Sequence, residues 1–64
     1  MKYGAPSPAV LADNSGGSAN DTIQALADGT TYANDVAAIR NNFSDLAAKV
    51  NQIIAALKAA GITF

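Results

Sequence analysis

The sequence contains no cysteine and no histidine, and only 14% of its 64 residues are charged. Without cysteine the chain forms no disulfide and offers no thiolate to a metal ion, and without histidine only carboxylates are left as metal ligands. Nucleophilic catalysis that relies on a cysteine or on a histidine base is excluded for the same reason. We therefore expect a protein that is not an enzyme and that uses no metal and no cofactor.

Charge of one sign and long apolar runs are also scarce. Four basic and five acidic residues give a net charge of −1, which leaves no basic patch for nucleic acid. No run of 18 or more apolar residues predicts a membrane-spanning helix. Pro6 and Pro8 stand where a secretory signal would have its apolar core, so no signal peptide is expected. Neither nucleic acid nor a membrane is an expected partner.

A chain of this length has too little interior to be stable by itself. Chains near 60 residues bury only about 60% of the surface that they expose when unfolded. Disulfides, bound metals and oligomerisation are the usual remedies for so small a core. Because the sequence offers neither thiols nor imidazoles, oligomerisation is the remedy that is left.

Composition divides the chain near residue 30. Residues 1–30, which we call the arm, are rich in glycine, serine, asparagine and aspartate and predict an irregular, extended segment. Within the arm, residues 21–29 fit either a two-turn helix or an extended segment. Residues 31–60 predict one long helix that starts at a threonine cap and ends at Gly61. The expected fold is mainly α, with the arm as one region and a coiled-coil helix over residues 31–64 as the other.

Apolar residues recur along this helix at alternating steps of three and four. We call them the apolar stripe: Val36, Ile39, Phe43, Leu46, Val50, Ile53 and Leu57. In a heptad with Val36 at position a, the stripe fills positions a and d, and Ala60 takes the next d. The arm offers few apolar partners, so the pattern predicts self-association with the stripe and Ala60 as the interface. The alternative is a helix packed against the rest of its own chain.

The residue types at the seam favour more than two strands. Ile39 and Ile53 at position d suit three or four helices, and small or apolar residues at position e, such as Ala47 and Ile54, broaden the contact face. We expect a homotrimer, and the charged residues beside the seam favour a parallel one.

Charged residues beside the seam suggest two ion pairs. In a parallel coil, position g of one chain meets position e of the next, so Asp35 and Arg40 are expected to pair between chains. Within one helix, Asp45 and Lys49 have the i,i+4 spacing of a favourable pair. Each pair at an exposed position contributes at most about 1 kcal/mol.

Two segments carry a resemblance to a known class of proteins. They are the loop DNSGGSANDTI at residues 13–23 and the terminal segment LAAKVNQIIAALKAAGI at residues 46–62. In these segments the chain resembles small structural proteins of tailed bacteriophages, of the head fibre or capsid decoration type. The resemblance implies a homotrimer on the capsid exterior of a virion, assembled in the host cytoplasm. It also implies a structural partner, either the major capsid protein or another virion structural protein.

The arm is the candidate for docking on that partner. Segments without a core of their own tend to become ordered on another surface. The candidate docking residues are the large apolar ones of the arm: Tyr3, Val10, Leu11, Ile23 and Leu26. An arm that wraps its own trimer is the alternative. Other functions left open are a short tail-associated or neck-associated fibre or adaptor, a general oligomerisation module, and a membrane-active amphipathic peptide.

Overall fold

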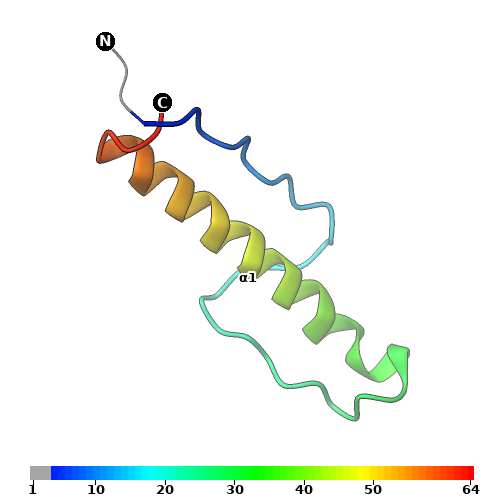
Figure 1. Cartoon of the computed structure of the whole chain (residues 1–64). Coiled ribbons are helices and arrows are strands. Elements are labelled where there is room, and N and C mark those ends of the chain that lie inside the picture. Colours follow the sequence, from blue (N-terminus) through cyan, green and yellow to red (C-terminus); the bar gives the residue numbers. More distant parts are fainter. Residues whose placement is uncertain (1–3) are drawn as a thin grey trace.

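The computed structural model describes residues 4–64, and it contains one helix, α1 (Tyr32–Ala59), and no strand in that range. With 28 residues, α1 is about 42 Å long. The described part of the arm lies along the helix from one end to the other (Figure 1). The result is a rod of 52 × 18 × 16 Å. The mainly α fold and the helix predicted over residues 31–60 are confirmed.

The helix begins differently from the prediction. Thr31 is the N-cap residue, but its side chain makes no capping hydrogen bond. The carboxylate of Asp28 instead accepts hydrogen bonds from the backbone N–H groups of Thr30 (2.6 Å) and Thr31 (2.8 Å) and from Asn34 Nδ2 (2.8 Å). An aspartate that binds backbone groups two and three residues ahead fixes a tight turn. The signal for the helix start is therefore Asp28 and not a threonine cap.

The helix ends as the sequence predicts. Gly61 has φ +77°, and its N–H donates to the carbonyl of Lys58 (3.0 Å), while the N–H of Ile62 donates to the carbonyl of Leu57 (3.0 Å). This pair of hydrogen bonds around a left-handed glycine is the Schellman motif, which satisfies the last carbonyls of a helix.

Residues after Gly61 pair with the start of the arm. Ala5 and Thr63 form an isolated parallel bridge, and the N–H of Ser7 donates to the carbonyl of Phe64 (2.6 Å). Ser7 Oγ also donates to Thr63 Oγ1 (2.6 Å). These contacts hold residues 5–7 beside the C-terminal end of α1, as Figure 1 shows.

From there the arm runs toward the other end of the helix and crosses to its other side on the way (Figure 1). At the crossing, Ser15 Oγ donates to the carbonyl of Arg40 (3.1 Å), and the N–H of Ser18 donates to Asn41 Oδ1 (2.9 Å). Residues 21–29 are extended or bent and contain no helix, and Asp21 has φ +61° instead of acting as a helix cap. We call residues 4–15 the first part of the arm and residues 20–30 its second part.

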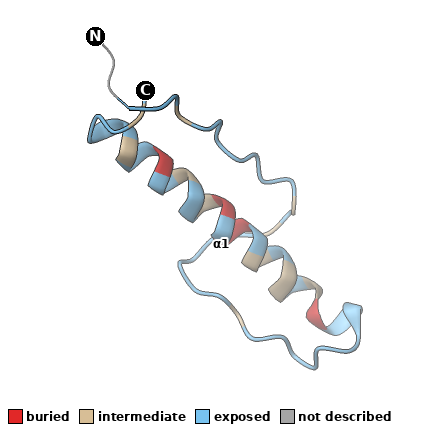
Figure 2. Cartoon of the chain, viewed as in Figure 1, coloured by how far each residue is buried: buried red, intermediate tan, exposed pale blue. Residues whose placement is uncertain are grey.

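The arm covers the polar side of the helix and leaves the apolar stripe open. Among residues 4–64, five are buried and they are mostly polar or small: Asp35, Ser44, Asp45, Ala47 and Ile54 (Figure 2). Within the stripe, Phe43 is 59% exposed, Leu46 54% and Ile53 53%. No large side chain is fully buried among residues 4–64. The helix is therefore not packed by its stripe against its own chain.

The position e residues Ala47 and Ile54 do not lie open beside the stripe, as the sequence had suggested. Ala47 and Ile54, at position e, are only 5% and 8% exposed because the first part of the arm covers them. They cannot broaden the seam as the sequence suggested. The preference for three strands now depends on the isoleucines at position d.

Gly17 allows the arm to cross the helix at close range. A Cβ atom at this position would overlap the carbonyl group of Arg40 and the backbone nitrogen of Asn41. We expect Gly17→Ala to displace the crossing and to lower the free energy of unfolding by about 1–3 kcal/mol, the usual cost of overpacking. Urea unfolding followed by far-ultraviolet circular dichroism measures this change. Gly29→Ala is the control, because its Cβ would meet no atom within 4 Å and only the positive φ adds strain.

Candidate interaction surface

Asparagines on the polar side of α1 bind the backbone of the arm. Asn51 Oδ1 accepts from the N–H of Leu11 (2.7 Å), and Asn51 Nδ2 donates to the carbonyl of the same residue (3.0 Å). Asn42 repeats this arrangement with Gln24, at 2.7 Å and 3.0 Å. Each amide thus satisfies both backbone groups of one arm residue, as a neighbouring strand does in a sheet.

Two aspartates of the helix also bind arm backbone groups. Asp45 Oδ1 accepts from the N–H groups of Asn20 (2.6 Å) and Asp21 (2.9 Å). The two carboxylate oxygens of Asp35 accept from the N–H groups of Asp28 (3.0 Å) and Gly29 (2.8 Å). Asp35 and Asp45 are only 3% and 5% exposed, so these charge-assisted hydrogen bonds are shielded from water. They hold the second part of the arm on α1.

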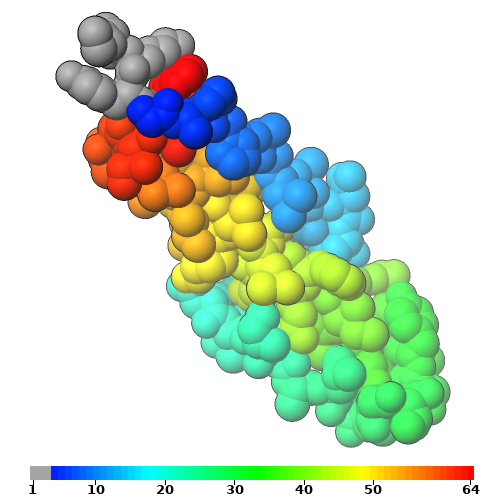
Figure 3. All heavy atoms as spheres, in the orientation of Figure 1, coloured from blue at the N-terminus to red at the C-terminus, as the bar shows by residue number. Residues whose placement is uncertain are grey.

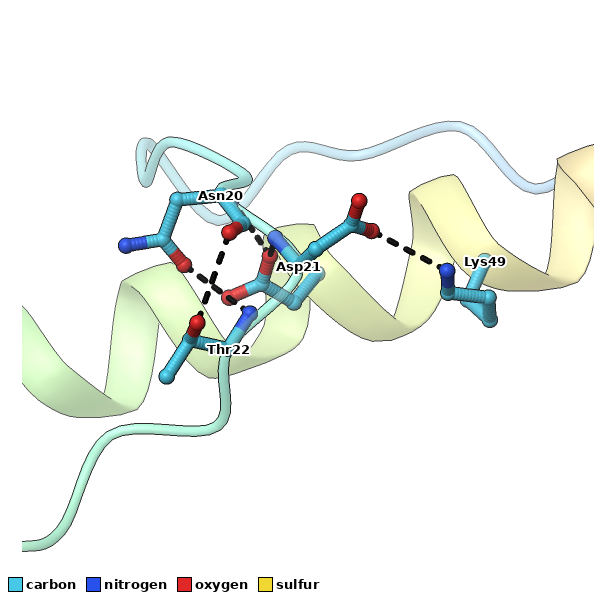
Figure 4. Close-up of polar contacts among 5 residues, drawn as sticks. Asn20, Asp21, Thr22 and Lys49 are labelled. Atoms are coloured by element: carbon cyan, nitrogen blue, oxygen red, sulfur yellow. Dashed lines mark hydrogen bonds and ion pairs between the residues drawn. The ribbon is translucent and has the colours of Figure 1, made fainter.

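These contacts change the expected ion pairs. Asp35 is buried and bonded within its own chain, so it is not available to Arg40 of a neighbouring chain without giving up both arm contacts. We therefore do not retain the pair between Asp35 and Arg40. Lys49 Nζ pairs with Asp21 Oδ1 (3.0 Å), on the arm (Figure 4). Asp45 binds backbone N–H groups instead. The Lys49–Asp21 pair is exposed and contributes little to stability.

The uncovered apolar stripe is the candidate interaction surface, and the arm lies on both sides of it. The helix is visible between the two parts of the arm in the space-filling view (Figure 3). On one side, residues 11–15 form a shallow hollow with Phe43 and Ala47. On the other side, residues 21–23 form a hollow with Asp45, Leu46 and Lys49. A third hollow lies on the stripe itself, lined by Ile39, Asn42, Phe43 and Leu46.

The predicted site residues divide into two groups in the structure. The stripe residues share one face of α1, with Val36, Ile39 and Leu57 half-buried and Ala60 exposed beyond the helix end. Four of the predicted docking residues are 47–68% exposed on the arm: Val10, Leu11, Ile23 and Leu26. The fifth, Tyr3, lies outside the described residues.

Sequence reasoning missed the residues that bind the arm, namely Asp35, Asn41, Asn42, Asp45 and Asn51. The sequence predicted ion pairs for Asp35 and Asp45 and indicated no role for Asn41, Asn42 and Asn51. A signal was present, because asparagine and aspartate are poor helix formers and yet recur on the polar side of an alanine-rich helix.

Asp28 makes the helix start sensitive to acid. Hydrogen bonds from the Asn34 side chain and from the N–H groups of Thr30 and Thr31 lower the pKa of Asp28 below its ordinary value of 3.8. A lowered pKa stabilises the folded chain fully above pH 3.8, and this contribution is lost as the pH falls through the folded-state value. We expect the midpoint temperature of thermal unfolding to decrease when the pH is lowered from about 6 to about 2.5.

Asp28→Asn isolates this contribution, because asparagine keeps an acceptor oxygen but does not titrate. The variant is expected to lose less of its thermal stability on acidification than the parent chain, as measured by circular dichroism. Equal losses in both chains would show that Asp28 does not contribute to the acid dependence.

In residues 4–64, no helix has both the length and the hydropathy that a membrane span requires, and no three potential metal ligands gather at one place. Comparisons of the chain with models of protein families, with curated proteins and with solved structures found no match.

Proposed function

We propose that the chain is a non-enzymatic structural subunit of a phage virion, a trimeric head fibre or capsid decoration protein. The observation that carries the self-associating part of this proposal is the exposed stripe. Phe43, Leu46, Val50 and Ile53 leave 42–59% of their surface open along one face of α1, and the arm lies elsewhere. An apolar surface of this length on a small chain is typical of an interface.

The heptad register supports a trimer, with Ile39 and Ile53 at position d. A closed ring of three identical chains has cyclic symmetry, which makes the three helices parallel. The virion assignment is supported by the resemblance of residues 13–23 and 46–62 to phage structural proteins. Attachment to the major capsid protein or to another virion structural protein is proposed for the exposed apolar side chains of the arm, such as Val10 and Leu26.

Sedimentation equilibrium without lipid, together with a far-ultraviolet helicity measurement, tests self-association. We expect a helical species with three times the chain mass of 6.4 kDa. A chain that stays monomeric would contradict the trimer. A chain that becomes helical only after addition of phosphatidylglycerol vesicles would instead indicate a membrane-active peptide.

Virion membership is tested on purified particles of a phage that encodes the chain. Mass spectrometry of gradient-purified particles should detect the chain in a fixed ratio to the major capsid protein. Its complete removal by a high-salt wash, with capsids intact and the trimer in the supernatant, would indicate a contaminant. Labelling at the tail or neck would favour a tail-associated fibre or adaptor.

A further inference from the structure

We propose that the two parts of the arm belong to the contact between subunits, with Leu11 of one chain facing Ile23 of the next. This inference rests on the proposed trimer and assigns these two residues to a second copy of the chain. It leaves Val10 and Leu26 for docking on a different protein.

The arm covers opposite sides of the stripe at the two ends of α1. Toward the C-terminal end of α1, the first part of the arm covers position e, where Ala47 and Ile54 are buried, while Ala56 at position g is exposed. Toward the N-terminal end, the second part covers position g, where it binds Asp35 and Asn42.

At that N-terminal level position e is open at Ala33, which is exposed, while Arg40, the next e residue, lies where the arm crosses the helix. In a parallel coil, position e of one helix lies beside position g of the next. Each groove between two helices therefore receives two parts of an arm. Near the C-terminal ends of the helices it receives the first part of one chain's arm, and near the N-terminal ends it receives the second part of the neighbouring chain's arm. The arm of each chain fills a space that the neighbour leaves open.

Leu11 and Ile23 are exposed on opposite sides of the middle of the stripe. Leu11 lines the hollow beside Phe43 and Ala47, on the e side of the stripe, and is 53% exposed. Ile23 lines the hollow beside Leu46 and Lys49, on the g side, and is 61% exposed. When an e side meets a g side, these two side chains come together from different chains. Their mutual burial removes apolar surface that a single chain leaves in water.

The face of α1 alone is too small for a stable interface. A stable interface buries about 800 Å² on each partner. A strip as long as α1 and as wide as a bare helix, about 42 by 10 Å, provides only about 420 Å². Including the two parts of the arm, each at its own end of α1, widens the strip toward the 18 Å width of the rod, which sets an upper bound of about 760 Å². The arm therefore supplies a substantial share of the area that a stable interface needs.

Engineered cysteines test this contact directly, because the chain has none of its own. The double variant Leu11→Cys/Ile23→Cys is oxidised with copper phenanthroline at a concentration where the reduced protein sediments as a trimer. We expect covalent dimers and trimers on a non-reducing gel, since each chain offers one thiol to each neighbour. Leu11→Cys/Thr30→Cys is the control. Thr30 lies just before the N-terminus of α1, away from the middle of the groove, so this variant should yield no covalent dimers or trimers.

The outcomes separate the two proposals. A trimer in sedimentation that gives no more interchain disulfide than the control, or only intrachain disulfide, would overturn the arm contact and leave the stripe trimer standing. A monomer in sedimentation would overturn both. A second pair of variants covers the case in which the cysteines disturb folding. Leu11→Ser should raise the dissociation constant of the trimer about tenfold or more. The neighbouring Val10→Ser, which lines none of the three hollows described above, should change it less than about twofold. Equal effects would count against the arm contact.

Discussion

Leu46→Asp is expected to convert the trimer into monomers. Leu46 lies at the centre of the stripe, lines the hollow on the stripe and the one beside Lys49, and is 54% exposed in a single chain. In the trimer it would be covered by two neighbouring helices. Losing a buried leucine costs about 1.5–3 kcal/mol per chain, and placing an unpaired carboxylate in the seam costs more. Three copies of the change multiply the effect, so the trimer dissociation constant should rise by several orders of magnitude.

Sedimentation equilibrium at one fixed concentration measures this loss, and circular dichroism measures the accompanying fall in thermal stability. Gln52→Asp is the matched control, because it adds the same charge at an exposed position outside the stripe. The control should remain trimeric. A trimer that persists in Leu46→Asp would show that the stripe is not the seam.

Asp45→Ala is expected to release the middle of the arm. Its carboxylate accepts the N–H groups of Asn20 and Asp21, and the alanine variant leaves both donors without their acceptor. Each lost contact of this kind costs about 1–3 kcal/mol, which is a large fraction of the stability of a small domain. The arm should then open far more often than in the parent chain.

Limited proteolysis with thermolysin detects that opening, because the enzyme cleaves at exposed large apolar residues such as Ile23 and Leu26. We expect at least a tenfold faster cleavage of the arm in Asp45→Ala. The cleavage rate of Asp45→Asn should lie between those of the parent chain and Asp45→Ala, because the amide oxygen of asparagine still accepts both N–H groups. Its NH₂ group takes the place of Oδ2, which has no hydrogen-bond partner among residues 4–64. Equal cleavage of the alanine variant and the parent chain would contradict the role of Asp45.

The helix and its stripe could be predicted from sequence because both follow from local rules. A Gly61 that ends the helix and a repeat of three and four fix the end and the apolar face without reference to any other part of the chain. The observed helix, Tyr32–Ala59, lies within one residue of the prediction at each end.

The path of the arm could not be predicted in this way. It depends on contacts between residues up to 40 positions apart, such as Asn51 with Leu11. An asparagine on the polar side of a helix has the same appearance in sequence whether it faces water or binds a backbone. The same cause explains why the sequence pointed Asp35 to an ion pair between chains and Ala47 to a broader seam: the arm contacts of both residues cannot be read from local spacing.

The way in which helix side chains hold the arm has a consequence for how ordered the chain will look. Of the described residues 4–64, 28 are helical, and the composition of the arm is that of a disordered tail. Slow hydrogen–deuterium exchange should nevertheless extend into the arm, at the amides of Leu11, Ser18, Asn20, Gln24 and Gly29, because each donates to a side chain of α1. In this protein, irregular backbone and native order coincide over almost half of the chain.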